Sequence, residues 1–293
     1  MKKYTIVGIG ELLFDVFPDR KALGGAPTNF AYHCQQLGHE AISVSAIGRD
    51  TLGEEIKAEI QARQLPTILQ ETDYPTGTVQ VTLSTTGSPT YEISEDVAWD
   101  HIAFTDELRA LAQRTDAVCF GSLAQRHEAS RTAILSFLKA MPEGSLRIFD
   151  INLRLQYYTR ETIHTSLEHA DILKLNDEEV PIVARLLGLE GDMEAVCRQV
   201  LTDYSLRAVI LTRGANGCSI YHEKGSVFHP SACIKVADTV GAGDSFTAGF
   251  VSALLVGRSH LEAVALATRV AAFVCSHHGA MPMLPSEYRV VEA

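Results

Sequence analysis

The run RIFDI at residues 147–151 is followed by ILKL at 172–175 and by AVILT at 208–212. Each run is short and largely apolar, which is typical of strands that are buried on both faces of a sheet. Polar and apolar residues mix at helical spacing between and around these runs, at residues 160–169, 178–187 and 193–204. This alternation of strand and helix predicts a parallel sheet that is covered by helices on both sides.

The same alternation extends toward both ends of the chain. Further candidate strands cover residues 5–9, 41–46 and 117–120. Further candidate helices cover residues 27–37, 52–64, 106–114, 128–141, 244–256 and 261–275. The fold class is therefore α/β, with helical layers on a central sheet.

Residues 76–93, TGTVQVTLSTTGSPTYEI, break this pattern because their side chains alternate with period two. Val79 and Val81 fall on one face, and a turn is expected at residues 87–89. A hairpin of this size is not stable alone. We therefore expect an accessory antiparallel sheet on one edge of a single domain spanning residues 1–293.

Composition and charge exclude several classes of protein. The 293 residues carry a formal net charge of −11, which argues against a broad basic surface for nucleic acid. No apolar run is long enough to span a membrane. The six cysteines are scattered, form no C-x-x-C pair and follow no signal peptide, so we expect a reduced cytoplasmic protein.

The strongest chemical motif is DTVGAGDSF at residues 238–246. Small residues precede an apolar helix, so backbone N–H groups can converge on an anion where the helix dipole also favours negative charge. Asp244 would repel a bound phosphate, yet it suits a base that takes a proton from a hydroxyl attacking that phosphate. An ordinary capped helix with an acid in its first turn is the alternative.

A second motif, GGAPTNFA, occupies residues 24–31. Two glycines precede a helix that has proline near its first turn. Asn29 would be presented near the start of this helix, where its amide could bond sugar hydroxyls. A flexible turn followed by a helix cap explains the glycines as well.

Three further segments follow predicted strands: DINLR at 150–154, NDEE at 176–179 and TRGANG at 212–217. Ligands of open parallel sheets gather at the carboxyl ends of strands. In the first segment, Asn152 and Arg154 alternate onto one side and could contact a phosphate together. In the second, the clustered carboxylates of residues 176–179 suit a hydrated Mg²⁺. In the third, the turn at residues 212–217 could contact a nucleotide. The alternative for residues 150–154 is a surface loop with a salt bridge. For residues 176–179 it is an acidic helix N-terminus, and for residues 212–217 it is a plain hairpin turn.

Several familiar catalytic motifs are missing from the sequence. There is no Gly-Lys-Ser/Thr and hence no P-loop, and no protein-kinase catalytic loop or DFG. Gly8 and Gly10 are followed by Leu13 where a dinucleotide-binding motif has glycine. A Rossmann dehydrogenase is therefore disfavoured.

Taken together, these motifs resemble those of the ribokinase-like (PfkB) carbohydrate kinases. GGAPTNFAYHCQQLG at 24–38 and DTVGAGDSFTAGF at 238–250 are highly specific, and FDINLR, KLNDEE and TRGANG lie between them in the family's order. The resemblance runs the full length of the chain. Gly10-Glu11 and the GGAPTN segment look most like fructokinases.

The resemblance implies a three-layer α/β/α domain with a small β-sheet lid, formed by residues 11–18 and 74–98 and inserted in the main domain. It also implies a homodimer that assembles through the lid. Ile151 departs from the family, since many members have proline there. The lid is the poorest match, and it is the part that selects the sugar.

The resemblance also implies roles for individual residues. Asp244 would be the catalytic base, Gly241, Ala242 and Gly243 would form the anion hole, and Arg154 would bind phosphate. The sugar would contact Asp15, Gly25 and Asn29, and the nucleotide would contact Asn176, Thr212, Gly214 and Gly217. Glu179 would hold Mg²⁺ through water. Asp238, with carbonyls of residues 275–279, would hold a monovalent cation such as K⁺.

The implied activity is ATP-dependent transfer of the γ-phosphate to a primary hydroxyl of a small sugar, with fructose as the acceptor. Kinases for ribose or for a keto-deoxy sugar acid are alternatives within the family. A catalytically inactive sugar-binding homologue is another alternative, although Asp244, Arg154 and Glu179 are all present.

Overall fold

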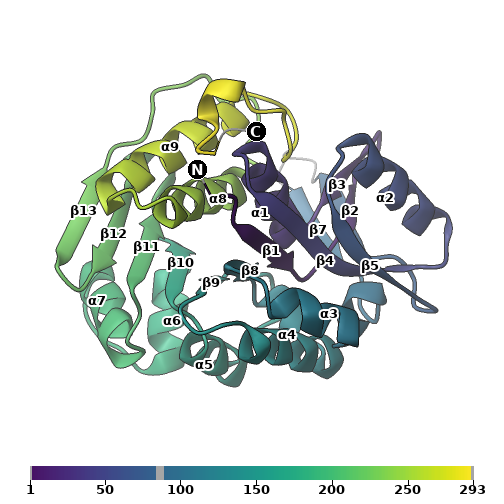
Figure 1. The fold of residues 1–293 in the computed structure, drawn as a ribbon, viewed down its shortest axis with the longest axis horizontal. Coiled ribbons are helices and arrows are strands. Elements are labelled where there is room, and N and C mark those ends of the chain that lie inside the picture. Colours follow the sequence, from purple (N-terminus) through teal and green to yellow (C-terminus); the bar gives the residue numbers. More distant parts are fainter. Residues whose placement is uncertain (1, 84–88, 292–293) are drawn as a thin grey trace.

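The computed structural model describes residues 2–83 and 89–291, and within them the main sheet has nine strands (Figure 1). Their order is β13-β12-β11-β10-β9-β8-β1-β4-β5. The parallel strands are β1 (Thr5–Ile9), β4 (Glu40–Gly48), β5 (Thr67–Thr72), β8 (Ala117–Phe120), β9 (Leu146–Asp150), β10 (Ile172–Asn176) and β11 (Ala208–Thr212). Two antiparallel strands, β12 (Cys218–His222) and β13 (Gly225–His229), complete one edge.

Helices cover both faces of this sheet, which makes three layers (Figure 1). One face carries α1 (Ala26–Gln36), α2 (Thr51–Ala62), α8 (Ala242–Leu255) and α9 (His260–Cys275). The other carries α3 (Asp106–Ala112), α4 (Glu128–Ala140), α5 (Arg160–Glu168), α6 (Val180–Leu187) and α7 (Met193–Asp203).

The sheet separates two apolar cores, because successive side chains of a strand point to opposite faces. Val7 and Ile9 of β1 belong to the core beneath α3–α7, whereas Ile6 belongs to the core beneath α1 and α8. Phe137 and Phe250 are among the largest fully buried side chains, one in each core. This double burial explains why the strands appear in the sequence as nearly continuous apolar runs.

A second, four-stranded sheet has the order β3-β2-β6-β7. It consists of β2 (Leu13–Val16), β3 (Lys21–Gly24), β6 (Thr78–Leu83) and β7 (Pro89–Ile93). The expected hairpin is present as the antiparallel pair β6–β7, while β2 pairs in parallel with β6. Residues 87 and 88 of the expected turn lie outside the described residues. Lys21 of β3 pairs with Glu55 of α2, so this small sheet lies beside α2.

The expected α/β fold with its small sheet is confirmed, but the expected parallel sheet is extended at one edge by two antiparallel strands that were not predicted. The segment after Gly217 returns as two antiparallel strands joined by a tight turn at residues 222–225. A short hairpin of this kind needs no crossover helix. The helix expected from residue 178 begins at Val180 instead.

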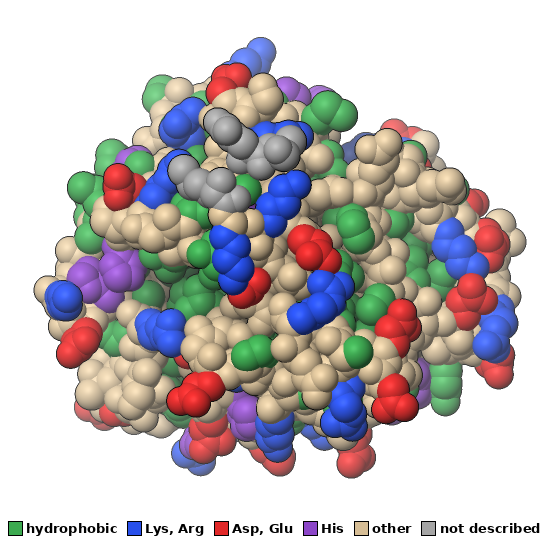
Figure 2. All heavy atoms as spheres, in the orientation of Figure 1, with side chains coloured by type: hydrophobic (Ala, Val, Ile, Leu, Met, Phe, Trp, Pro, Cys, Tyr) green, Lys and Arg blue, Asp and Glu red, His purple; other side chains and the backbone are tan. Residues whose placement is uncertain are grey.

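The surface agrees with the acidic composition. On the face drawn in Figure 2, Lys and Arg side chains are interspersed with Asp and Glu, and the described residues there form no continuous basic area. We find no helix in the described part of the chain with both the length and the apolar character that a membrane crossing requires.

Candidate active site

The two most specific sequence motifs meet at one hydrogen bond. Gly241, with φ +75°, precedes α8 and places Asp244 in the first turn of that helix. Asn29 lies in the first turn of α1, which starts after Gly25 at φ +122°. Asn29 Nδ2 donates to Asp244 Oδ2 at 2.7 Å. A Cβ at position 25 would lie 2.4 Å from the carbonyl oxygen of Glu11, so only glycine fits where α1 begins.

The small-residue loop presents two free backbone donors. The N–H groups of Gly241 and Gly243 have no acceptor among the described residues, whereas that of Ala242 donates to the Thr239 carbonyl at 3.2 Å. The first N–H groups of a helix lack intrahelical partners and attract anions. Two of the three expected anion-hole amides are therefore available, and the amide of Ala242 stabilises the turn itself.

A buried ion pair packs against the loop at residues 241–243. Lys174 Nζ lies 2.9 Å from Asp150 Oδ1, and Thr247 Oγ1 donates to Asp150 Oδ2 at 2.9 Å. A Cβ at Gly243 would lie 2.9 Å from Lys174 Nζ. Burial alone would lower the pKa of Lys174, but nearby carboxylates, chiefly Asp150, raise it, so the ammonium stays charged.

Glu11 lies in this region, although the sequence motifs predicted no site role for it. It follows β1, is only 3% exposed, and accepts the Ala26 N–H at Oε1 over 3.3 Å. Its Oε2 is buried and has no hydrogen-bond partner among the described residues. Burial raises the pKa of Glu11 to about 7, and the charge of Asp244 acts in the same direction.

Two further carboxyl groups have raised pKa values here. Burial, and then the charge of Asp150, raise the pKa of Asp244 to about 6, while the bond from Asn29 opposes the shift. Burial raises the pKa of Asp15 to about 6, against the opposing charge of Arg154. Several perturbed carboxyl groups in one place are typical of functional sites.

Arg154 carries the positive charge that faces these acids. Its charge lowers the pKa values of Glu11, Asp15 and Asp244. The side chain is exposed, and no carboxylate in the described residues lies within ion-pair distance of it. The expected alternation of Asn152 and Arg154 onto one side was wrong, since β9 ends at Asp150 and Asn152 takes φ +42°.

Glu179 joins the loops that follow β9 and β10. Its Oε1 accepts the Leu153 N–H and its Oε2 accepts the Asn176 N–H, both at 2.8 Å. Asn176 Oδ1 in turn accepts the Glu179 N–H at 2.9 Å. Burial raises the pKa of Glu179. Each carboxylate oxygen keeps a second acceptor position, so Glu179 could still contact a metal ion or its bound water.

Local hydrogen bonds fix the two segments for which nucleotide and cation binding were predicted. Thr212 ends β11 beside Asn176 of β10, and the turn Gly214–Asn216 follows, closed by the Arg213 N–H bond to the Gly217 carbonyl at 2.8 Å. Elsewhere, Asp238 Oδ2 accepts the Gly279 N–H at 3.1 Å. Asp238 therefore lies beside the 275–279 segment.

Most of these groups follow the carboxyl ends of parallel strands. Glu11 follows β1. The strands β9, β10 and β11 end at Asp150, Asn176 and Thr212. The first turns of α1 and α8 bring Asn29 and Asp244 to the same region. A carboxylate base, a free-amide loop and basic side chains in one site suit transfer of a phosphoryl group to a hydroxyl.

Comparison with known proteins agrees with this chemistry. The model of the pfkB family of carbohydrate kinases matches residues 10–287. A probable fructokinase of Arabidopsis thaliana is 30% identical, over 96% of this chain and 94% of its own length. An ATP-dependent 6-phosphofructokinase of Thermoanaerobacterium thermosaccharolyticum is 28% identical, over 97% and 92% of the two chains.

A solved structure extends the likeness to three dimensions. The crystal structure of a sugar kinase from Pyrococcus horikoshii in complex with ATP superposes with a TM-score of 0.83 at 28% identity, covering 94% of each chain. The family match, the fold and the residues assembled at the strand ends lead to one conclusion: the chain belongs to the pfkB family of carbohydrate kinases.

Proposed function

We propose that this kinase transfers the γ-phosphate of ATP to a primary hydroxyl of a small sugar, and that the sugar is fructose. The observation that carries the proposal is the Asn29–Asp244 hydrogen bond beside the free amides of Gly241 and Gly243. This arrangement supports a role for Asp244 as a base beside an anion-binding helix start. Phosphoryl transfer needs chiefly this combination of a positioned hydroxyl and stabilised phosphate charge.

The sugar side of the site offers buried acceptors that lack donors. Glu11 Oε2 and Asn29 Oδ1 are both buried and have no partner among the described residues. Buried polar atoms are nearly always hydrogen-bonded. Sugar hydroxyls would supply the missing donors, and Asp15 would accept another hydroxyl on the same side.

The phosphate side would be formed by Arg154 and the free amides, with the Lys174–Asp150 pair beneath them. Asp244 would take the hydroxyl proton while Arg154 and the amides hold the phosphoryl oxygens. Mg²⁺, when bound with ATP, would neutralise phosphate charge, with Glu179 contacting its water. Asp238 and the 275–279 segment would hold K⁺, and closure of the small sheet would exclude water.

Fructose is proposed on the similarity to the Arabidopsis protein and on the GE and GGAPTN segments. The Thermoanaerobacterium relative makes fructose 6-phosphate the second candidate. The small sheet is expected to select between acceptors, since β2 carries Asp15.

The test is ADP release from MgATP with fructose, fructose 6-phosphate, ribose and a keto-deoxy sugar acid under identical salt. We expect the highest kcat/KM for fructose and a stimulation that is at least roughly a hundredfold weaker in Asp244→Asn. A tenfold preference for another acceptor would replace fructose and leave the kinase mechanism intact. If no acceptor stimulates ADP release, the inactive-homologue alternative is favoured.

A further inference from the structure

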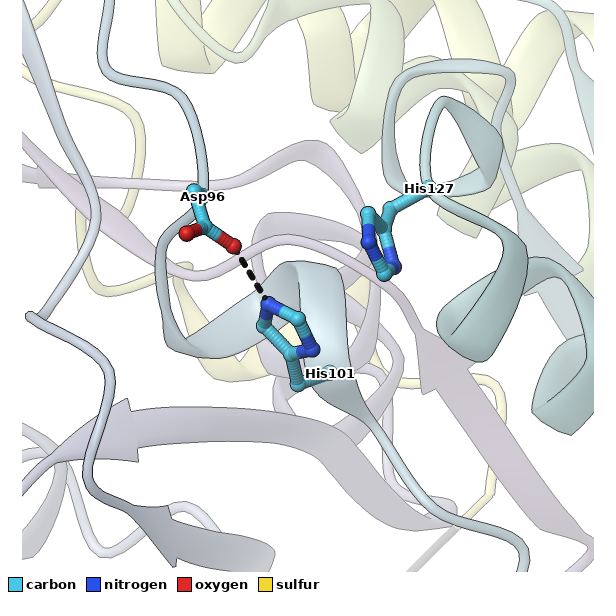
Figure 3. A group of neighbouring side chains, drawn as sticks. All are labelled: Asp96, His101 and His127. Atoms are coloured by element: carbon cyan, nitrogen blue, oxygen red, sulfur yellow. Dashed lines mark hydrogen bonds and ion pairs between the residues drawn. The ribbon is translucent and has the colours of Figure 1, made fainter.

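Two histidines and one aspartate, none of them among the residues described above, converge at one point (Figure 3). One ligand atom from each of Asp96, His101 and His127 lies within 4.8 Å of the other two. In the described ranges 2–83 and 89–291, no other group of three or more His, Cys, Asp or Glu side chains meets this condition.

The three side chains come from different elements. Asp96 follows β7, on the segment that returns from the small sheet to the main domain. His101 ends a single 3-10 turn, Ala98–His101, and His127 caps the start of α4. The cluster therefore spans the junction between the small sheet and a helix of the main domain.

The rings are held in place before any ion arrives. His101 Nε2 lies 2.8 Å from Asp96 Oδ1, and its ring stacks on Tyr74 with centroids 3.4 Å apart. The centroids of His101 and His127 are 4.4 Å apart. His101 is largely buried and Asp96 is exposed, so an ion could enter from solvent on the Asp96 side.

Nearby cations do not compete for the aspartate. Arg126, the residue before His127, is buried and pairs with Asp100 at 2.7 Å. Asp96 has His101 as its one ion-pair partner among the described residues. The His101–Asp96 hydrogen bond and the capping bond from the Ala129 N–H to His127 explain single contacts, but neither explains why all three ligand atoms lie within 4.8 Å of one another.

We propose that Asp96, His101 and His127 bind a divalent transition-metal ion of the zinc class. Two imidazoles and a carboxylate suit Zn²⁺, Co²⁺ or Ni²⁺, whereas Mg²⁺ and Ca²⁺ prefer oxygen ligands throughout. The ion takes the place of the proton that His101 Nε2 shares with Asp96, and that proton leaves to solvent. It links the return segment of the small sheet to α4, separately from any Mg²⁺ that accompanies ATP.

The experiment is titration of the tag-free, nucleotide-free protein with Zn²⁺ by calorimetry and with Co²⁺ by visible absorption. Cys233 is exposed and free, so all variants carry Cys233→Ser as background. His127→Asn removes the imidazole while keeping a side chain that caps helices well. His101→Gln removes the other ring, and circular dichroism and melting temperature establish that each variant folds.

Asp96→Asn tests the aspartate separately. Its amide oxygen can still accept from His101, but the charge is gone. The matched control is His222→Asn, because His222 stacks on His260 with centroids 4.4 Å apart, a second histidine pair outside the cluster.

We expect saturable binding of one ion per chain in the background protein and in His222→Asn. His127→Asn and His101→Gln should lose it, and Asp96→Asn should weaken it by at least the roughly 10-fold that even the loss of an outer-shell carboxylate causes, because a neutral amide replaces a charged ligand. Zn²⁺ should raise the melting temperature only where the site is intact. Equal binding in the folded His127→Asn variant, or no binding to the background protein, would overturn the proposal.

Discussion

Asn29 holds Asp244 through a 2.7 Å hydrogen bond, although 215 positions separate the two residues. The bond engages Oδ2, and no described residue donates a hydrogen bond to Oδ1 of Asp244. One oxygen is therefore fixed while the other is available to a substrate hydroxyl. This division of roles within one carboxylate is what a positioned general base requires.

Asp244→Asn should reduce kcat by roughly a hundredfold or more, which is the usual contribution of a general base. The amide has nearly the shape of the carboxylate but cannot take the hydroxyl proton. Steady-state ADP release at saturating ATP and sugar measures the effect. Glu107→Gln, an exposed acid in the first turn of α3, is the control and should keep wild-type turnover. An Asn variant with near-wild-type kcat would contradict the assignment.

The pH dependence of kcat/KM should show an acidic limb near pH 6. As the proposed base, Asp244 could accept a proton only when ionised, and burial raises its pKa to about 6, so the rate should fall below that pH. Asn29→Ala removes a hydrogen bond that favours the ionised form, so the limb should move to higher pH. The measurement is kcat/KM between pH 5 and 8 for both proteins. If the acidic limb of the pH profile lies at the same pH in both proteins, the Asn29 hydrogen bond does not influence the pKa of Asp244.

Glu11 should make the folded protein less stable as pH rises. Its pKa is raised from 4.5 in the unfolded chain to about 7, so between these values the native state holds more protons than the unfolded state. The free energy of unfolding therefore falls as pH rises through this window. Asp15 and Asp244 act in the same direction, because their pKa values are also raised.

Glu11→Gln should consequently shrink the drop in melting temperature between pH 5 and pH 8. The amide keeps an oxygen for the Ala26 N–H and carries no titrating proton. Thermal unfolding at the two pH values measures the difference, with Glu107→Gln as the exposed control. A drop equal to that of the wild type would mean that Glu11 titrates normally.

The strands and the individual motifs were predictable because they carry local signals. The strands at 5–9, 117–120 and 208–212 have the expected bounds, since burial on both faces leaves a continuous apolar run. β5 went unpredicted because its side chains are only partly buried and most of them are polar. β12 and β13 carried a usable signal, the Glu-Lys-Gly turn between two short alternating runs.

The architecture of the site was harder to predict, because it depends on contacts between distant residues. Nothing near Glu11 in the sequence indicates a buried carboxylate with an unpartnered oxygen. Lys174 was detectable, since a charged residue inside the apolar run ILKL must find a partner when buried. That partner is Asp150, for which the sequence predicted no separate role within the segment 150–154.

Gly243→Ala should lower kcat by roughly a hundredfold, the scale seen when an anion-hole donor is lost. The new Cβ would lie 2.9 Å from Lys174 Nζ, which is buried and paired with Asp150 and so cannot easily retreat. Gly249→Ala in the same helix is the control, because its Cβ would also approach a neighbour, Ala267 Cα, to 2.9 Å. We expect Gly249→Ala to lose stability but keep its turnover per folded molecule. Equal turnover in both variants would place the anion hole elsewhere.

Arg154→Lys should behave as a severe change rather than a conservative one. The guanidinium offers a planar pair of donors to two phosphate oxygens, while an ammonium is a single point charge on a flexible stem. Arg154 also faces Glu11, Asp15 and Asp244, whose pKa values its charge lowers, and no described carboxylate pairs with it. Its donors are therefore available to a ligand, apart from Nη1, which lies 3.1 Å from the Leu153 carbonyl.

We expect Arg154→Lys to lower kcat/KM for ATP at least tenfold, a loss of about 1.4 kcal/mol in transition-state stabilisation. The loss should persist when Mg²⁺ is raised, because added metal cannot replace the bidentate contact. Arg160→Lys, an exposed arginine at the start of α5, is the matched control and should leave kcat/KM unchanged. Arg154→Met removes the charge as well as the planar group. If part of the effect is electrostatic, its kcat/KM for ATP should be lower than that of Arg154→Lys. Unchanged ATP kinetics in Arg154→Lys would return this residue to an ordinary surface position.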